Sequence, residues 1–123
     1  MTLRRPERDP HVLLPLTPAM FHVLVSLADE DRHGYAILKD VAARTAGAVE
    51  LGTSTLYGII KRLLAEGLAI ESPRRPPADR DDERRRYYRL TDFGRRVVAA
   101  ETARLEAMVT AARATRTLRK ASS

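Results

Sequence analysis

Three histidines and a short acidic run are the residues in this sequence whose chemistry could support catalysis or metal binding. His11, His22 and His33 stand far apart, and His22 has neither a histidine nor an acid three or four residues further on. The acidic run lacks the spacing of a Ca²⁺-binding loop and is surrounded by arginines: Asp79, Asp81, Asp82 and Glu83. No histidine forms a triad with a nucleophile. We therefore predict no catalytic residue, no metal site and no cofactor, and we expect a protein that is not an enzyme.

The size and composition of the chain narrow the possible classes of protein. Its 123 residues, 44% of them hydrophobic, allow one domain with a modest core. The absence of cysteine excludes disulfides and thiolate zinc sites and fits a reducing compartment. Apolar runs such as residues 97–100 are far shorter than the roughly 20 residues of a membrane span, and the N-terminus does not resemble a signal peptide. We therefore expect a soluble, cytoplasmic protein without a membrane partner.

The positive charge of the chain is concentrated in particular segments. The net charge of +6 comes from 22 Lys and Arg against 16 Asp and Glu. Residues 72–89 alone hold seven arginines and four acids, a local excess of +3. Four more basic residues lie near the C-terminus and have no assigned role: Arg113, Arg116, Arg119 and Lys120. A basic excess of this kind indicates a polyanionic partner.

Apolar residues at helical spacing predict three helices in the first half of the chain. The first begins at Pro18 behind the N-cap residue Thr17 and ends at the acidic residues 29–31. The second covers about residues 34–45, and the third about residues 53–66. Their predicted buried positions are, helix by helix, Met20, Phe21, Leu24, Leu27 and Ala28; Tyr35, Leu38, Val41 and Ala42; and Leu56, Ile59, Ile60, Leu63 and Leu64.

The boundaries of the third helix follow from its flanking residues. Thr53 or Ser54 is expected to cap its start, and Gly67 is expected to end it in a left-handed conformation. Before it, the alternation at residues 49–51 is compatible with one or two bridge residues of strand.

The second half of the chain predicts a hairpin followed by a long helix. Residues 68–71 and 85–90 have the pattern of two strands, and the proline-rich stretch between them predicts a loop. Thr91 is the expected N-cap of a last helix, which continues to about Leu118 without a proline. The fold class is therefore mainly α with a small two-stranded antiparallel hairpin. This order is that of a winged helix-turn-helix followed by a long C-terminal helix.

The outer face of the third helix and the hairpin tip suit DNA. A helix of this kind fits the major groove and reads base edges with its N-terminal residues, while basic residues a turn later contact phosphates. An arginine-rich tip can follow the phosphate backbone or enter a minor groove. The candidate DNA-binding residues are Thr53, Ser54, Thr55, Tyr57, Gly58, Lys61, Arg62, Arg74, Arg75, Arg80, Arg84, Arg85 and Arg86.

Five short segments, in this order and at these separations, resemble the signature of PadR-type transcriptional regulators. They are His33-Gly34-Tyr35, Thr55-Leu56-Tyr57, Lys61-Arg62-Leu63, Glu66-Gly67-Leu68 and Arg86-Tyr87-Tyr88-Arg89-Leu90-Thr91. The resemblance covers about residues 16–100. It implies a homodimeric bacterial repressor of the phenolic-acid and multidrug-response kind, with the third helix in the major groove, a wing on the flanking backbone and a C-terminal dimerisation helix.

The resemblance extends to particular residues and also has departures. Thr55, Tyr57 and Lys61 match DNA-facing positions of the family, and Tyr87 with Tyr88 match the strand that returns from the wing. Residues 52–54 read Gly-Thr-Ser where the family commonly has Ser-Pro-Gly. Gly58 stands where the family frequently has Pro or Ala, and Leu64 stands where it frequently has Glu. The family's base preference therefore does not carry over to this chain. Some relatives hold flat aromatic ligands between tryptophans, but this chain has no tryptophan and we assign no ligand pocket.

The last helix carries a loosely heptad-like apolar stripe that a small domain cannot cover entirely. We predict that it pairs with a second copy through Val97, Val98, Leu105, Met108, Val109 and Ala112. The alternative is that only its first turns pack within the chain and the remainder frays. The predicted organisation is a partly disordered arm at residues 1–15, a DNA-binding domain at 16–90, a dimerisation helix at 91–119 and a disordered tail at 120–123.

The function that these patterns favour is sequence-specific binding of double-stranded DNA at a palindromic operator, by a cytoplasmic protein associated with the bacterial nucleoid. A homodimeric repressor released by a small-molecule effector of unknown identity is the expected form. Two alternatives stay open. One is a winged-helix module that binds another protein, and the other is a nucleoid protein that binds DNA without sequence preference.

Overall fold

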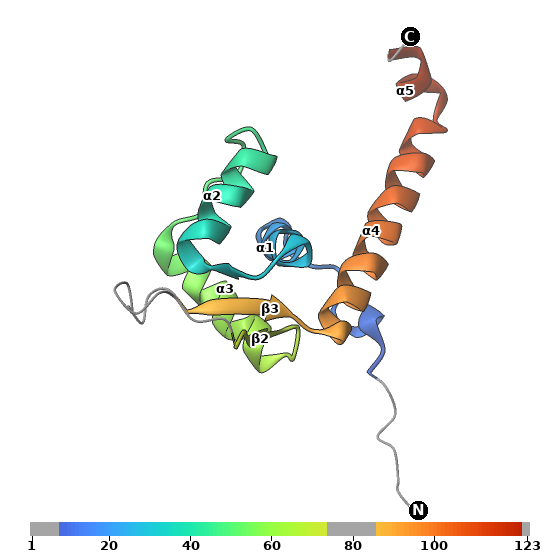
Figure 1. The fold of residues 1–123 in the computed structure, drawn as a ribbon. Helices are drawn as coiled ribbons and strands as arrows, with labels where there is room; N and C mark the ends of the chain where they lie inside the picture. The colour runs from blue at the N-terminus through green and yellow to red at the C-terminus, as the bar shows by residue number, and fades with distance from the viewer. Residues whose placement is uncertain (1–7, 74–85, 122–123) are drawn as a thin grey trace, which may run out of the picture.

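The structure is a computed structural model that describes residues 8–73 and 86–121 (Figure 1). Three helices and a small sheet form the domain, and a long helix leaves it with its C-terminal half projecting away from the other helices (Figure 1). The elements in chain order are η1 (Pro10–Leu13), α1 (Pro18–Asp29), β1 (Arg32–His33), α2 (Gly34–Arg44), α3 (Thr53–Ala65), β2 (Ala69–Glu71), β3 (Tyr87–Leu90), α4 (Asp92–Arg113) and α5 (Arg116–Ala121).

Helix α1 begins as the sequence predicts. The Thr17 hydroxyl accepts a hydrogen bond from the Met20 amide at 3.2 Å, and Pro18 occupies the first helical position. Val23, Leu24 and Leu27 are fully buried in the core, whereas Phe21 and Ala28 lie half-buried at its edge. The buried face of α1 is therefore rotated slightly from the predicted stripe, toward Val23 and away from Phe21 and Ala28.

The core-facing side of α2 is predicted correctly at Val41 and wrongly at Tyr35. Ile37 and Val41 are buried, but Tyr35 is 60% exposed. The start of this helix is fixed by His33, whose Nδ1 accepts the Ala36 amide at 3.1 Å. With that start, Ile37 and Val41 point inward one turn apart and Tyr35 points outward. The assignment of Tyr35 to the core was wrong.

Helix α3 buries Leu56, Ile60 and Leu63, as its periodicity predicts. Leu64, also predicted to be buried, is 40% exposed because it lies at the margin of that face. The helix begins at Thr53 with Gly52 as N-cap and no side-chain cap, so the prediction of Thr53 or Ser54 as cap was wrong.

The end of α3 confirms the predicted role of Gly67. This residue has φ of +73°, in the left-handed region that glycine favours. The Leu68 amide donates to the Leu63 carbonyl at 2.8 Å and the Gly67 amide to the Leu64 carbonyl at 3.2 Å. This paired arrangement ends the helix and turns the chain directly into β2.

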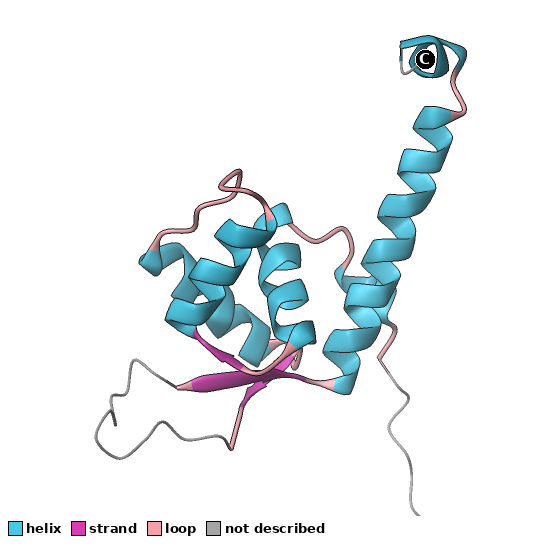
Figure 2. Ribbon diagram, turned by 45° about the horizontal axis from the view of Figure 1, so that its top comes forward, coloured by secondary structure: helices cyan, strands magenta, loops and turns pink. Residues whose placement is uncertain are grey.

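Within residues 8–73 and 86–121 the sheet has three antiparallel strands in the order β1-β3-β2, one more than predicted. The hairpin partners are Ala69↔Leu90 and Glu71↔Tyr88, and the added strand pairs Arg32 with Tyr88. The sheet lies against one side of the helices (Figure 2). Residues 49–51, which carried a strand-like alternation, have no strand pairing. Two residues of β1 are too few to give a periodic signal.

Helix α4 begins as predicted and ends earlier. The Thr91 hydroxyl accepts the Gly94 amide at 2.9 Å, which confirms it as N-cap. The helix stops at Arg113, where one continuous helix to Leu118 was expected. Thr115 interrupts it, because its hydroxyl donates to the Ala112 carbonyl at 2.8 Å and accepts the Leu118 amide at 3.4 Å. A threonine in that position starts a new short helix, α5.

Candidate nucleic-acid interface

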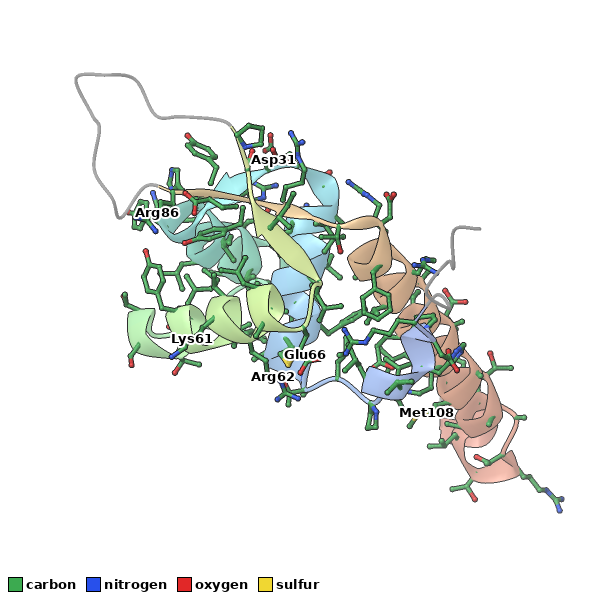
Figure 3. The ribbon with its side chains drawn as sticks, turned by 90° about the horizontal axis from the view of Figure 1, so that it is seen from below. Asp31, Lys61, Arg62, Glu66, Arg86 and Met108 are labelled. Carbon is green, nitrogen blue, oxygen red and sulfur yellow. The ribbon has the colours of Figure 1, made fainter. Side chains whose placement is uncertain are left out.

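The outward face of α3 is exposed within the described part of the chain. Successive residues of a helix are turned by about 100°, so Ser54, Gly58 and Lys61 lie opposite the buried Leu56 and Ile60. Figure 3 shows Lys61 and Arg62 at the outer edge of the helix. All the candidate residues on α3 are exposed: Thr53, Ser54, Thr55, Tyr57, Gly58, Lys61 and Arg62. The structure thus brings them together on one accessible surface, which we call the α3 face.

Gly58 lies at the centre of the α3 face. A Cβ built on it would meet nothing within 4 Å among the described residues. Packing of those residues therefore gives no reason for a glycine, which costs about 1 kcal/mol relative to alanine inside a helix. A glycine there leaves room for another molecule to approach the backbone of α3 closely.

Tyr57 lies at the margin of the α3 face and contacts the start of α2. It is 37% exposed, and a Cβ on Gly34 would come within 2.8 Å of its hydroxyl oxygen. Burial raises the pKa of the nearby Tyr88 phenol, and the hydroxyl of Tyr57 and the Glu71 carboxylate raise it further. Tyr57 therefore links α3 to the first turn of α2.

Two exposed residues of α2 extend this surface and were missed by the sequence analysis. The Lys39 ammonium lies 5.0 Å from the centre of the Tyr35 ring, a cation–π contact. Tyr35 is adjacent in the chain to Gly34, which Tyr57 contacts. On a helix that buries Ile37 and Val41, both Tyr35 and Lys39 point outward. The sequence-based prediction assigned Tyr35 to the core because it counted this residue among the apolar positions.

The base of the wing is held by Asp31, in the turn between α1 and β1. Its carboxylate accepts the Ser72 hydroxyl at 2.7 Å and pairs with the Arg89 guanidinium at 3.0 Å. Ser72 directly follows β2 and Arg89 lies on β3, so a single carboxylate contacts both sides of the hairpin. Ser72 and Arg89 were predicted in the hairpin, but their contact with Asp31 has no signal in the sequence pattern.

Only one of the candidate wing residues can be described. Arg86 is exposed at the start of β3, with its Nε 3.8 Å from the Glu71 carboxylate, on the same side of the domain as Asp31 (Figure 3). The other candidates fall outside the described residues: Arg74, Arg75, Arg80, Arg84 and Arg85.

His11 and His33 each contact a neighbouring residue of the fold. His11 Nδ1 lies 2.9 Å from the Asp9 carboxylate in the exposed η1, and His33 caps α2 and stacks edge-on against Tyr87 at 5.3 Å. Among residues 8–73 and 86–121 no group of three or more acids and histidines is placed to hold a metal ion.

The predicted dimerisation stripe is covered at its start and open further along α4. Val97 is buried and Val98 half-buried, whereas Met108 and Val109 are 55% and 50% exposed. Leu105 is half-buried and Ala112 exposed. Between α1 and α4 lies an open groove of roughly 510 Å³, lined by Phe21, Thr102, Leu105, Glu106, Val109, Thr110 and Arg113.

A three-helix core, an exposed third helix with basic residues and a strand pair after it define a winged helix-turn-helix protein of the DNA-binding class. Its family is the transcriptional regulator PadR-like family, to which the chain belongs, with a match over residues 23–100. Proteins of this family are DNA-binding transcriptional regulators. None of the helices in the described part of the chain is both long and apolar enough to cross a membrane.

Solved structures share this architecture. RosR of H. salinarum, in the complex named hsRosR-S4, is 25% identical, with a TM-score of 0.64 over 91% of this chain and 88% of that one. BpsR of Bordetella bronchiseptica is 28% identical, with a TM-score of 0.60 over 86% of this chain and 73% of that one. The BpsR structure concerns regulation of its DNA binding by 6-hydroxynicotinic acid.

A sequence relative is Uncharacterized protein X of Lysinibacillus sphaericus. It is 30% identical over 73 residues, which are 59% of this chain and 64% of that protein. The chain thus spans slightly less than two thirds of this relative.

Proposed function

We propose that this protein is a sequence-specific repressor that binds a palindromic operator as a homodimer. The observation that carries the proposal is the α3 face, which is exposed and basic and has Gly58 open at its centre. A groove of DNA can approach a helix with this surface without displacing any described part of the chain.

We propose a division of roles within the interface. Ser54, Thr55 and Tyr57 contact base edges, since the first turns of a recognition helix reach the groove floor. Lys61 and Arg62 contact phosphates, as do the backbone amides of residues 53–55 at the helix start. The arginines of the wing lie along the flanking backbone. The domain at residues 16–90 then binds DNA, and residues 91–119 form the dimer.

A second copy of this chain is the proposed partner of α4. Met108 and Val109 together with the groove beside α1 leave an apolar surface that pairing would cover. A dimer also places two recognition helices at the spacing of a palindrome. Light scattering at micromolar concentration should report twice the chain mass. A monomer there, or a Val109→Glu variant that stays dimeric, would contradict pairing through this stripe.

We also propose that a small molecule releases the repressor from DNA. BpsR offers a structural precedent, because its DNA binding is regulated by 6-hydroxynicotinic acid. The groove between α1 and α4 is large enough for a ligand and shares Leu105 and Val109 with the proposed dimer interface, so that a bound ligand would alter the pairing of the two copies.

The function is tested by measuring affinity for the DNA upstream of the protein's own gene and for random DNA at several salt concentrations. A repressor binds the upstream DNA more tightly by a factor of roughly 10³ or more. Equal affinity with equal salt dependence would indicate a non-specific nucleoid protein. Absence of binding to both would favour a protein-interaction module.

A further inference from the structure

The N-terminal strap, residues 8–17, connects the recognition helix with the proposed dimerisation helix. Its 3-10 turn η1 packs on α4, and Leu16 is buried in the core. Residues 8–15 of the strap were expected to be part of a partly disordered arm. Its two ends instead make specific polar contacts with two different helices, α3 and α4.

At one end, Arg8 binds the C-terminal end of α3. Its Nη1 donates to the Glu66 carbonyl at 2.6 Å and its Nη2 to the Glu66 carboxylate at 2.7 Å. The same guanidinium lies 4.9 Å from the centre of the Phe93 ring on α4. A cation on the last carbonyls of a helix is favourable, because these groups carry the negative end of the helix dipole.

At the other end, Glu101 of α4 binds Leu16. The Glu101 carboxylate is 1% exposed and accepts the Leu16 amide at 2.8 Å. Arg104 pairs with the same carboxylate, and its Nη1 lies 3.1 Å from the Met108 sulfur on the exposed part of the stripe. Glu101, which interrupts the apolar stripe of α4, therefore holds the strap to this helix. This contact lies beside the surface that a second copy would cover.

The contact of Arg8 with Glu66 also affects Arg62, one turn earlier on α3. Arg62 and Glu66 line the same small cavity beneath the strap, with Leu13, Leu16 and Met20. Residues four apart on a helix can form an ion pair. The ion pair with Arg8 neutralises the Glu66 carboxylate. In this arrangement Arg62 makes no ion pair with another described residue.

We propose that the N-terminal strap couples α4 to the recognition helix. Arg8 keeps Glu66 away from Arg62, and Glu101 holds the strap in the position from which Arg8 reaches Glu66. The strap is thus a positioning element for DNA binding, and this role rests on the proposed function. A second copy that covers α4 then influences how rigidly the C-terminal end of α3 is held.

The first test measures the affinity of the full chain for its upstream DNA. Arg8→Ala should weaken binding about three- to tenfold and reduce the salt slope by about one contact, because Glu66 then pairs with Arg62. Arg8→Ala combined with Glu66→Gln should recover affinity to within about twofold of the wild type. Arg96→Ala is the matched control, since it removes another cation from the Phe93 ring. Unchanged affinity of Arg8→Ala, or no recovery in the double variant, would overturn the proposal.

The second test needs no DNA and separates the strap from the proposed function. Hydrogen exchange of single amides should be about threefold faster at Glu66 and Leu68 in Arg8→Ala and also in Glu101→Gln. These amides donate to the carbonyls of Arg62 and Leu63 at the end of α3. If Glu101→Gln changes exchange only in α4 and at Leu16, the coupling does not exist. If the wild type does not bind DNA but the exchange result holds, the repressor function fails and the coupling stands.

Discussion

The hydroxyl of Tyr57 on α3 lies against Gly34, the first residue of α2, at a place where any Cβ would come within 2.8 Å of it. Gly34 is buried and its neighbour His33 caps α2, so the backbone there is fixed. The position of Tyr57 at the margin of the α3 face therefore depends on the absence of a side chain at residue 34.

We predict that Gly34→Ala displaces the Tyr57 ring while the fold is kept, because the end of a tyrosine can move more easily than the backbone. Affinity for the upstream DNA should fall about fivefold, with a smaller effect on random DNA. Competition binding measures both. Equal loss on the two DNAs would contradict a role of Tyr57 in sequence preference, and Arg62→Ala provides the reference for such uniform loss.

Gly58→Ala should separate stability from DNA binding. The new Cβ meets nothing in the described chain, so the variant should be more stable by about 0.5–1 kcal/mol. The same methyl group stands at the centre of the α3 face and should weaken binding to upstream DNA about fivefold. Denaturant unfolding and binding titrations give the two values. A variant that is more stable and binds equally well would remove Gly58 from the interface.

Gly94→Ala should lower the stability of the fold, in contrast to Gly58→Ala. A Cβ at position 94 would overlap the backbone carbonyl of Leu68 and press on Leu90 at 2.8 Å. Because a backbone carbonyl cannot rotate aside, unfolding free energy should drop by about 3 kcal/mol, which lowers the melting temperature by roughly 10 °C. Thermal denaturation against the wild type measures this. A shift below about 2 °C would show that α4 adjusts without cost.

Protonation of Glu101 should loosen the strap. The hydrogen-bonded Arg104 guanidinium lowers the pKa of this buried carboxyl despite the opposing effect of burial, and the Leu16 amide lowers it further. A lowered native pKa means that the ionised group stabilises the fold above about pH 4.3, the ordinary value for glutamate, and that this stability is lost as the pH falls through the lowered pKa.

The corresponding measurement compares the wild type with Glu101→Gln in denaturant at several pH values. The difference in unfolding free energy should be constant from about pH 5 to pH 7 and should shrink below about pH 4. A difference that stays constant through acid pH would mean that the charge of Glu101 does not contribute.

Features that depend on nearby residues were predictable from the sequence. Thr17 and Thr91 cap helices and Gly67 ends one because each acts on backbone groups within a few positions. Features set by distant contacts were not. The strand β1 exists only because β3 lies beside it, and the Glu101 carboxylate meets the Leu16 amide across 85 residues.

The central claim is that the α3 face binds DNA, and chemical-shift mapping tests it most directly. Upstream DNA is titrated into the isotope-labelled full chain, and the backbone amide shifts are followed. Our account predicts that the largest changes occur at residues 53–62, with smaller ones at Tyr35 and Arg86. Changes confined to α4 and α5, or none on α3 at saturating DNA, would contradict it.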